Sequence, residues 1–502
     1  MTGSWLATTV LALYYLVLGV LSLYGMHRMV LVVLYLRGRR RVAAAPAASP
    51  TAALPRVTVQ LPLYNEMYVA QRLIEAVCRL DYPRELLEVQ VLDDSTDETT
   101  SVVADTVARL RGLGFAIEHL HRGERTGFKA GALAAGAERA RGELIAVFDA
   151  DFVPDPDFLR RAVPWFADPR IGMVQGRWEH LNRDYSLLTR VQAILLDGHF
   201  VVEHTARHAS GCFFNFNGTA GVWRREVIAA AGGWQHDTLT EDLDLSYRAQ
   251  LAGWRFVYLP ELTVPSELPV DVNGFKSQQF RWAKGSIQTA RKLLGRILAA
   301  PLPLRVKGEA FIHLTNNVSY VLMVALSLLL PAAMLIRRGQ PVATLLAVDL
   351  PLFAAATASV VVFYVASQAG AGRRWWRDLV YVPALMAVGI GLSVSNARAV
   401  VSGWRHRGGT FERTPKYRIE RRGEDWLGKR YRAGRSAAVL GEGLLTAYLA
   451  AAFLHAAWTG LWASLPFLYL FLQGYLFVFL LSVVPGRAGR SRAPRVQPAR
   501  LP

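Results

Sequence analysis

Short blocks of apolar and polar residues alternate between residues 56 and 152, whereas long apolar stretches occupy both ends of the chain. In the central part, bounded apolar runs predict strands, and apolar residues at helical spacing predict helices. The expected strands cover 57–61, 89–92, 115–119 and a run from Leu144, and the expected helices cover 66–80, 98–111 and 129–141. Such strand–helix repetition is typical of a parallel, doubly wound sheet. No Gly-x-Gly-x-x-Gly turn or Walker loop occurs there, which disfavours a dinucleotide dehydrogenase or a P-loop ATPase.

The terminal stretches are long enough to cross a bilayer. The first apolar run covers residues 6–36, and later runs cover about 309–335, 342–368, 377–397, 437–458 and 461–484. Basic residues 37–41 follow the first run directly. The first run lacks a preceding basic region and a small-residue cleavage site, so we expect an uncleaved membrane anchor rather than a signal peptide. Because positive flanks stay in the cytoplasm, we expect its amino terminus outside.

The run 377–397 decides the topology of the second half. If it spanned the membrane with the other four, the arginine-rich loop 398–436 and the basic tail would lie outside. That arrangement violates the positive-inside rule. The run is also interrupted by proline, two glycines and an asparagine. We therefore predict that 377–397 lies in the membrane interface, which leaves five spans.

These expectations divide a multi-pass protein of the inner or plasma membrane into four parts. The parts are a transmembrane helix with its basic flank (1–41), a cytoplasmic α/β domain ending in interfacial helices (42–300), a helical membrane bundle that includes the interfacial helix and a cytoplasmic loop (301–485), and a basic cytoplasmic tail (486–502).

Charge and composition bear on the partners. The 502 residues carry a formal net charge of +18, and 52% of them are hydrophobic. Nucleic acid would suit this charge, but no nucleic-acid module is recognisable, and the arginine clusters lie beside apolar runs. We therefore expect contacts with membrane lipids and none with nucleic acid. Two cysteines, Cys78 and Cys212, provide neither a disulfide framework nor a cysteine-rich metal site.

Two carboxylates follow the strand that begins at Leu144, in the string Leu-Ile-Ala-Val-Phe-Asp-Ala-Asp-Phe. Asp149 and Asp151 lie at the carboxyl edge of the predicted sheet, where open α/β sheets bind ligands. Two carboxylates can hold one hard divalent cation, with phosphates and water as its other ligands. The pattern therefore suggests a nucleotide-diphosphate site, although Asp-x-Asp also occurs in ordinary surface loops.

Polar residues follow the earlier strands in the same way. Tyr64 and Glu66 come after the first strand, Asp93 and Asp94 after the second, and Lys129 opens a helix. Carboxylates and a ring there suit a base and ribose, and an ammonium at a helix start suits a phosphate. Helix capping and a solvated surface lysine are the alternative interpretations.

Two later stretches combine acid, amide and ring side chains. Glu241 and Asp242 begin an amphipathic helix, where a carboxylate is either a cap or a general base. The string Gln278-Gln-Phe-Arg-Trp offers an amide for a hydroxyl, a guanidinium for a phosphate and a ring for stacking on sugar. The alternative is an amphipathic helix lying on the membrane surface.

The ordered set of motifs resembles the processive membrane glycosyltransferases of family 2, the cellulose synthase superfamily. The motifs are Val59-Gln-Leu-Pro-Leu-Tyr-Asn-Glu, Asp93-Asp-Ser, Lys129-Ala-Gly, Asp149-Ala-Asp, Phe216-Asn-Gly-Thr-Ala-Gly-Val-Trp-Arg, Thr240-Glu-Asp and Gln278-x-x-Arg-Trp. The string that begins at Phe216 and the Gln278-Gln-x-Arg-Trp string are most similar to those of the cellulose-synthase-like A mannan and glucomannan synthases. The resemblance implies a GT-A (Rossmann-like) glycosyltransferase domain inserted in an α-helical multi-pass membrane domain.

The resemblance also implies roles for individual residues. The nucleotide and donor would be held by Tyr64, Glu66, Asp93, Asp94, Lys129, Asp149 and Arg281, and the metal, Mg²⁺ or Mn²⁺, by Asp149 and Asp151. The acceptor site would comprise Asn217, Gly218, Thr219, Gln278 and Trp282. Asp242, with Glu241 beside it, would be the catalytic base. Thr410-Phe-Glu-Arg-Thr-Pro-Lys-Tyr looks like the gating loop that covers the donor.

The implied activity is inverting, metal-dependent and processive transfer from a nucleotide sugar, GDP-mannose or UDP-glucose. The product would be a β-linked mannan, glucomannan or glucan that grows as the acceptor and passes through the membrane. A non-processive transferase that adds one sugar to a membrane lipid is the alternative, and a transporter or scaffold with a degenerate nucleotide fold is a third. The spacing of His199, Glu203, His204 and His208 would also suit a metal, but an acceptor-side or solvated helix is favoured.

Overall fold

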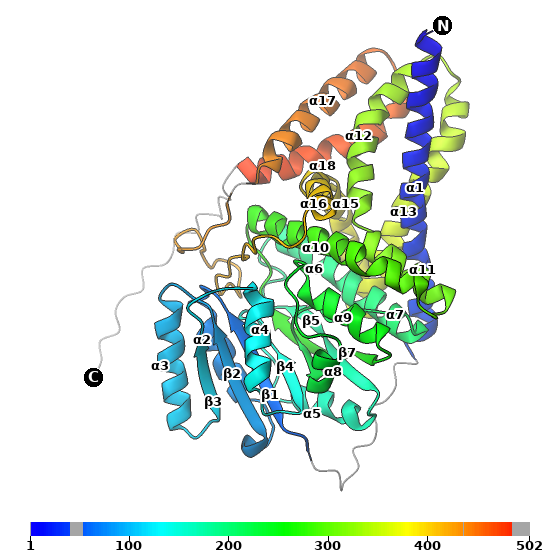
Figure 1. Cartoon of the computed structure of the whole chain (residues 1–502). Helices are drawn as coiled ribbons and strands as arrows, with labels where there is room; N and C mark the ends of the chain where they lie inside the picture. The colour runs from blue at the N-terminus through cyan, green and yellow to red at the C-terminus, as the bar shows by residue number, and fades with distance from the viewer. Residues whose placement is uncertain (1, 41–53, 435, 484–502) are drawn as a thin grey trace.

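A mixed seven-stranded sheet forms the centre of the α/β part of the molecule (Figure 1). The computed structural model describes residues 2–40, 54–434 and 436–483. The strands are β1 (Val57–Leu63), β2 (Leu87–Asp93), β3 (Ile117–His121), β4 (Leu144–Val147), β5 (Ile171–His180), β6 (Gly221–Arg224) and β7 (Arg255–Ser266). They lie in the order β3-β2-β1-β4-β6-β5-β7.

The predicted parallel arrangement is correct for the first four strands. β1 pairs in parallel with β2 and β4, and β2 with β3. β6, however, runs antiparallel to both β4 and β5. The sequence pattern predicted no strand after the run from Leu144, so it gave no information about the direction of β6. The result is the mixed sheet of a GT-A fold.

Helices cover both faces of this sheet. Alternate residues of β4 belong to two different cores: Leu144 and Ala146 face one side, and Ile145 and Val147 face the other. This two-sided burial explains why the strand reads as a continuous apolar run. One face is covered by α2 (Ala70–Cys78), α3 (Thr99–Gly112) and α5 (Phe158–Ala162), and the other by α4 (Phe128–Arg139), α8 (Arg225–Ala230) and α9 (Glu241–Leu251).

A layer of helices lies between the sheet and the upright helices of Figure 1. It contains α6 (Leu187–Asp197), the π-helical turn η3 (Gly198–His204), α7 (Thr205–Ser210), α10 (Val272–Ala299) and α11 (Leu304–Thr315). The short 3-10 turns η1 (Arg84–Leu86) and η2 (Val163–Ala167) belong to the sheet domain. α10 carries the Gln278-x-x-Arg-Trp string and therefore places it at the junction between the two parts.

Five helices in the described part of the chain are long and apolar enough to cross a membrane, so the chain is a membrane protein. The candidate spans are Trp5–Gly38, Val318–Ile336, Ala347–Gly370, Ala438–Trp458 and Trp462–Val483. They belong to α1 (Thr2–Gly38), α12 (Val318–Ile336), α13 (Val342–Gly370), α17 (Ala438–Trp458), and η5 (Trp462–Ser464) with α18 (Leu465–Val483).

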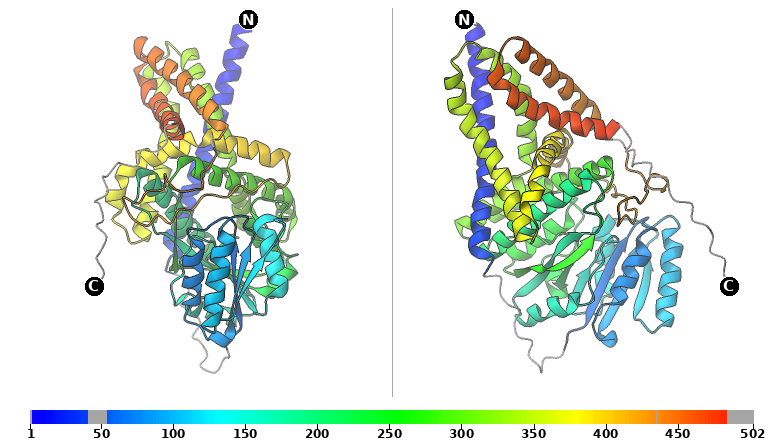
Figure 2. Two further views of the ribbon diagram at one scale, coloured as in Figure 1. Left: turned by 90° about the vertical axis from the view of Figure 1, so that its left-hand side faces the viewer. Right: turned by 180° about the vertical axis from the view of Figure 1, so that it is seen from behind.

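The predicted interfacial segment 377–397 falls on a broken helix. It comprises α14 (Trp375–Asp378), η4 (Leu379–Tyr381), α15 (Val382–Gly391) and α16 (Ser393–Arg405), with a bend of 42° after Gly391. Figure 2 shows α15 and α16 running across the upright helices rather than along them. The interfacial assignment stays a prediction, as do the four-part division and the cytoplasmic orientation. The basic tail 486–502 lies outside the described residues.

Candidate active site

A cavity opens at the carboxyl ends of β1 and β4, below α10. Its empty volume, including the part open to solvent, is about 1190 Å³. The predicted site residues that line it are Tyr64, Glu66, Asp94, Lys129, Asp149, Asp151, Asn217, Gly218, Glu241, Asp242, Gln278, Arg281 and Trp282. Residues from seven separate stretches of the sequence thus meet in one space.

The end of β4 places Asp149 against a lysine. The Asp149 backbone N–H donates to Thr219 Oγ1 at 2.9 Å, which fixes the turn that follows the strand. Its Oδ1 accepts from Lys129 Nζ at 2.5 Å, and the same ammonium donates to the Gly218 carbonyl at 2.9 Å. Burial raises the pKa of Asp149. Burial lowers the pKa of Lys129, but the carboxylates of Asp149, Glu241 and Asp242 together outweigh burial and raise the lysine pKa above its ordinary value.

Asp242 lies next to this pair even though it comes from α9. A Cβ added at Gly218 would lie 3.0 Å from Asp242 Oδ2 and 3.2 Å from Lys129 Nζ. Gly218 has φ +81°, which a residue with a side chain adopts only with strain. Glycine therefore leaves the space in which the Asp242 carboxylate and the Lys129 ammonium face the same part of the cavity.

The Asp242 carboxyl group has an unusually high pKa. Its Oδ1 accepts from the Leu243 N–H at 2.7 Å, within the first turn of α9. Burial and the neighbouring Glu241 raise the pKa of Asp242 to about 8. The pKa of Glu241 is itself raised by burial. Two carboxyl groups with raised pKa values at a cavity wall are typical of groups that exchange protons near neutral pH.

A loop from the distant 406–434 segment closes the cavity from another side. Lys416 Nζ donates to Asp151 Oδ2 at 2.7 Å and to the Glu267 carbonyl at 2.6 Å. The Glu267 carboxylate in turn accepts from the N–H groups of Tyr417 and Arg418, both at 2.8 Å. Asp151 is therefore held by a lysine that lies 265 positions away in the sequence.

The same loop contacts the turn after β1. Arg413 donates to the Tyr64 carbonyl at 2.9 Å and lies 3.6 Å from Glu66 Oε1. Burial raises the pKa of Glu66 to about 7 in spite of this arginine. Across the cavity rim, the Arg125 guanidinium stacks 3.5 Å from the centre of the Tyr64 ring. Tyr64 thus presents a ring already paired with a planar cation.

Helix α10 contributes the third wall. Arg281 donates to the Glu412 carbonyl and, at 3.2 Å, to Thr414 Oγ1. Burial lowers its pKa to about 10, which still leaves the guanidinium charged at neutral pH. One residue further, the Trp282 ring centre lies 6.4 Å from that of Trp178. Arg281 and Trp282 therefore lie in the same cavity as the aspartates, at the side nearest the membrane helices.

The structure does not bring two predicted residues to the cavity. Asp93 ends β2 one position before Asp94, and consecutive strand residues point to opposite faces. Asp94 lines the cavity and binds Arg122 at 2.6 and 2.7 Å, whereas Asp93 bonds His119 on the other face. Thr219 is fully buried beneath the cavity, where its hydroxyl oxygen accepts a hydrogen bond from the Asp149 backbone N–H.

The histidine-rich helix is part of a hydrogen-bonded network. His199 lies 3.0 Å from Glu203, and His199 and His204 both lie within 3.5 Å of the Asn217 amide. Within the described residues, the one group of three ligand atoms close enough for a metal is Asp93, His119 and His121. The helix therefore positions the cavity residue Asn217 through its imidazoles.

Comparison with known proteins assigns the sheet domain. Residues 55–285 match the family model described as "Glycosyltransferase like family 2". Residues 55–285 are a family 2 glycosyltransferase domain.

Plant relatives match the same domain. The chain is 47% identical over 251 residues to "Probable glucomannan 4-beta-mannosyltransferase 7" of Oryza sativa subsp. japonica, covering 49% of this chain and 43% of the relative. It is 45% identical over 249 residues to "Glucomannan 4-beta-mannosyltransferase 2" of Arabidopsis thaliana, covering 49% and 47%. The chain spans about half the length of the curated relatives that it matches. The predicted resemblance to the cellulose-synthase-like A branch is confirmed.

A solved structure is also similar to this chain. The mannosyltransferase PcManGT from Pyrobaculum calidifontis, in complex with GDP-Man and Mn²⁺, is 25% identical, with a TM-score of 0.48. The match covers 70% of this chain and 98% of that chain.

Several wall residues of the glycosyltransferase domain and its covering loop were not predicted individually. They are Arg125, Trp178, Glu267, Phe411, Arg413, Thr414 and Lys416. The resemblance predicts that the string 410–417 covers the donor. Its contacts with Asp151 and Glu66, however, depend on how the loop folds back onto the sheet domain. Arg125 lies four residues before Lys129, in the Arg-Thr-Gly-Phe-Lys string, and this adjacency was the one available signal.

Proposed function

We propose that this protein is an inverting, metal-dependent, processive glycosyltransferase that polymerises a β-linked mannan or glucomannan from a nucleotide sugar at the cytoplasmic face of a membrane. The supporting observation is that Asp149, Asp151, Asp242, Arg281 and Trp282 line one cavity beside the membrane helices. The 40–47% identity to relatives named glucomannan 4-beta-mannosyltransferases supports mannose as the transferred sugar.

A divalent metal fits the two aspartates of the Asp-x-Asp pair. Lys129 donates to Oδ1 of Asp149, and Lys416 donates to Oδ2 of Asp151. Within the described residues, the other carboxylate oxygen of each aspartate accepts no hydrogen bond and is available to a metal. Oxygen donors at the mouth of an anionic cavity are the ligands that Mg²⁺ and Mn²⁺ prefer. When bound, the metal would neutralise charge on the donor diphosphate.

Asp242 is the proposed base. It would take the proton from the acceptor hydroxyl while that oxygen forms a bond to the anomeric carbon and the bond to the nucleoside diphosphate breaks. Attack from the face opposite the leaving group gives a β linkage from an α-nucleotide sugar. General-base assistance contributes roughly 10²–10⁴ in rate, and a base with a pKa near the working pH performs best. The raised pKa of Asp242, about 8, meets that condition.

Two cations would stabilise the departing diphosphate. Lys129 lies at the start of α4, where the positive end of the helix dipole also favours phosphate, and Arg281 approaches from α10. Fixed positive groups at the site of developing charge usually supply the largest part of the catalytic effect. In this arrangement, Asp149 Oδ1 would keep its contact with Lys129, and the other oxygen of the carboxylate would be available to hold the metal.

The acceptor would occupy the side of the cavity bounded by α10. Trp282 offers a ring for the terminal sugar of the growing chain, and Gln278 and Asn217 offer amides for its hydroxyls. Because α10 lies between the sheet domain and the upright helices, the growing polymer would leave toward the membrane (Figure 1). This position favours a product held by the enzyme between successive additions.

The activity is testable on the full-length protein in detergent. With Mn²⁺ or Mg²⁺, we expect polymer with β-1,4 mannosyl linkages from GDP-mannose, and UDP-glucose as the second donor to test. Asp242→Asn is expected to lower the rate by at least about 10²-fold. Asp237→Asn, an exposed aspartate near α9, is the matched control and should retain activity. A product confined to single sugars on lipid would contradict processivity, and full activity of Asp242→Asn would remove the base assignment.

A further inference from the structure

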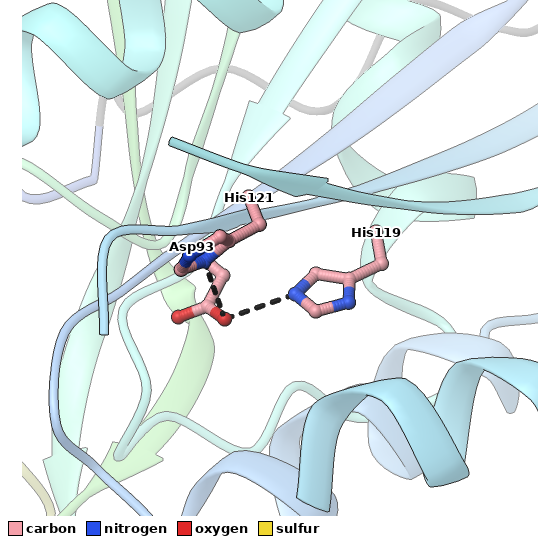
Figure 3. Close-up of side chains that lie close together, drawn as sticks. All are labelled: Asp93, His119 and His121. Carbon is pink, nitrogen blue, oxygen red and sulfur yellow. Dashed lines mark hydrogen bonds and ion pairs between the residues drawn. The ribbon is translucent and has the colours of Figure 1, made fainter. Parts of the chain in front are cut away.

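The carboxyl end of the edge strand β3 holds a cluster that the proposed transferase chemistry does not use (Figure 3). His119 and His121 lie two positions apart on β3 and therefore point to the same face of the sheet. Asp93 is the register partner of His121 on the neighbouring strand β2. All three side chains converge on the face opposite the one where Asp94 and Arg122 meet the cavity.

The distances within the cluster suit a small cation. Asp93 Oδ2 lies 2.9 Å from His119 Nε2 and 3.4 Å from His121 Nδ1, and all three ligand atoms lie within 4.8 Å of one another. Two ligand atoms of a tetrahedral zinc site, each about 2.0–2.1 Å from the metal, are about 3.3 Å apart. Both distances from Asp93 Oδ2 to an imidazole nitrogen are therefore within tenths of an ångström of the separation in a zinc site.

The surroundings of Asp93 have the organisation of a metal ligand. Its side chain is 0% exposed, and its other oxygen accepts from the Ser95 N–H at 2.9 Å. This bond holds the carboxylate in place while Oδ2 points at the imidazoles, as outer hydrogen bonds do for ligating carboxylates. The His121 side chain is 42% exposed, so solvent reaches the cluster and can supply a fourth ligand.

We propose that Asp93, His119 and His121 bind a transition-metal dication, with Zn²⁺ as the best-matched ion. Two imidazole nitrogens and one carboxylate oxygen form a borderline donor set, which zinc, cobalt and ferrous iron accept, whereas Mg²⁺ and Ca²⁺ prefer oxygen alone. This site is separate from Asp149 and Asp151, because it lies on the other face of the sheet and none of its three residues lines the cavity.

Such an ion would stabilise the edge of the sheet next to the cavity by cross-linking two strands. It would join the ends of β2 and β3 immediately before Asp94 and Arg122, the ion pair at the cavity rim. Arg122 is the nearest cation in sequence, and its charge is already matched by the bidentate contact with Asp94. The expected role is therefore to stabilise the edge strand and to position this pair.

Metal content of the full-length protein in detergent tests the proposal. After equilibration with Zn²⁺ in excess Mg²⁺ and removal of free metal, we expect one zinc ion per chain in an Asp149→Asn/Asp151→Asn variant, because the cavity pair is disabled there. Adding His119→Gln and His121→Gln should abolish this zinc. Glu118→Gln, on the same strand, and His455→Gln, a histidine elsewhere, are matched controls that should keep it.

A spectroscopic measurement on the unaltered protein protects the test against misfolded variants. X-ray absorption of the zinc-loaded protein should show two imidazoles and at least one oxygen ligand. Equal zinc content in the protein with and without the two histidines would overturn the proposal. Absence of bound zinc in the unaltered protein, or a ligand sphere without imidazole, would overturn it as well.

Discussion

Asp242 shows how burial can outweigh a favourable helix position. It lies in the first turn of α9, where the helix dipole stabilises a negative charge. That effect is at most about 2 kcal/mol in partly buried geometries. Burial and the adjacent Glu241 nevertheless raise the pKa of Asp242 to about 8. The residue therefore retains a basicity that a solvated aspartate lacks, at a cost to the folded state when it ionises.

This cost predicts that removing the charge stabilises the protein. The folded-state pKa of Asp242 is raised above its ordinary value of 3.8, so its contribution to folding is largest at low pH and is lost as pH rises to about 8. At pH 8 we expect Asp242→Asn to have a higher melting temperature than the parent protein. The increase should be about 2–4 °C for each kcal/mol by which removing the buried charge stabilises the folded state. The difference should shrink toward pH 5. Thermal unfolding in detergent measures it, and an unchanged or lower melting temperature at pH 8 would contradict the assignment.

At the scale of elements, a chain of polar contacts connects α1 with the cavity. It runs through α11, α7 and η3 with each link at 3.5 Å or less, and its members are His27, Glu309, Arg207, Glu203, His199 and Asn217. Arg207 is central, because its side chain is 1% exposed and pairs with both glutamates. His199 belongs to the π-helical turn η3 and lies between Glu203 and Asn217. Such π-helical turns are frequent at functional sites. The network thus fixes the first membrane helix to the acceptor side of the cavity.

Breaking this network should destabilise the junction between the sheet domain and the membrane helices. Glu309→Gln removes one partner of a buried arginine, a change that typically costs about 3–5 kcal/mol. Asp81→Asn removes an ion pair whose side chains are 59% and 65% exposed, and should change the stability far less because solvent screens this pair. Melting temperatures of the two variants in detergent compare these effects. Equal shifts would mean that the network does not stabilise the junction.

At the scale of the whole molecule, the loop 406–434 completes the cavity of the sheet domain. Lys416, Arg413 and Thr414 meet cavity residues, so this loop and the sheet domain occupy the same side of the bilayer. α17 begins shortly after the loop and ends at Trp458, which is 91% exposed at the far end of the helix. If α17 spans the membrane, positions 421 and 458 lie on opposite sides.

Labelling of single introduced cysteines tests this topology. Arg421→Cys should react with a membrane-impermeant thiol reagent in inside-out vesicles, and Trp458→Cys in right-side-out vesicles. The parent protein supplies the background, since Cys78 and Cys212 are both buried. Labelling of both positions from the same side would contradict a spanning α17 and the cytoplasmic assignment of the loop.

Local sequence patterns predicted the first four strands, the helices between them and most of the cavity residues. Alternating strands and helices, the carboxylates after Val147 and the acidic start of α9 are local patterns, and chain connectivity places the carboxyl ends of parallel strands at one edge of the sheet. The tertiary structure decided the rest. It reversed β6, turned Asp93 to the opposite face beside two histidines, and brought Lys416 onto Asp151 across 265 positions. These outcomes depend on strand direction, on which face the last residue of a strand takes, and on loop closure, and each is set by packing between distant segments rather than by local spacing.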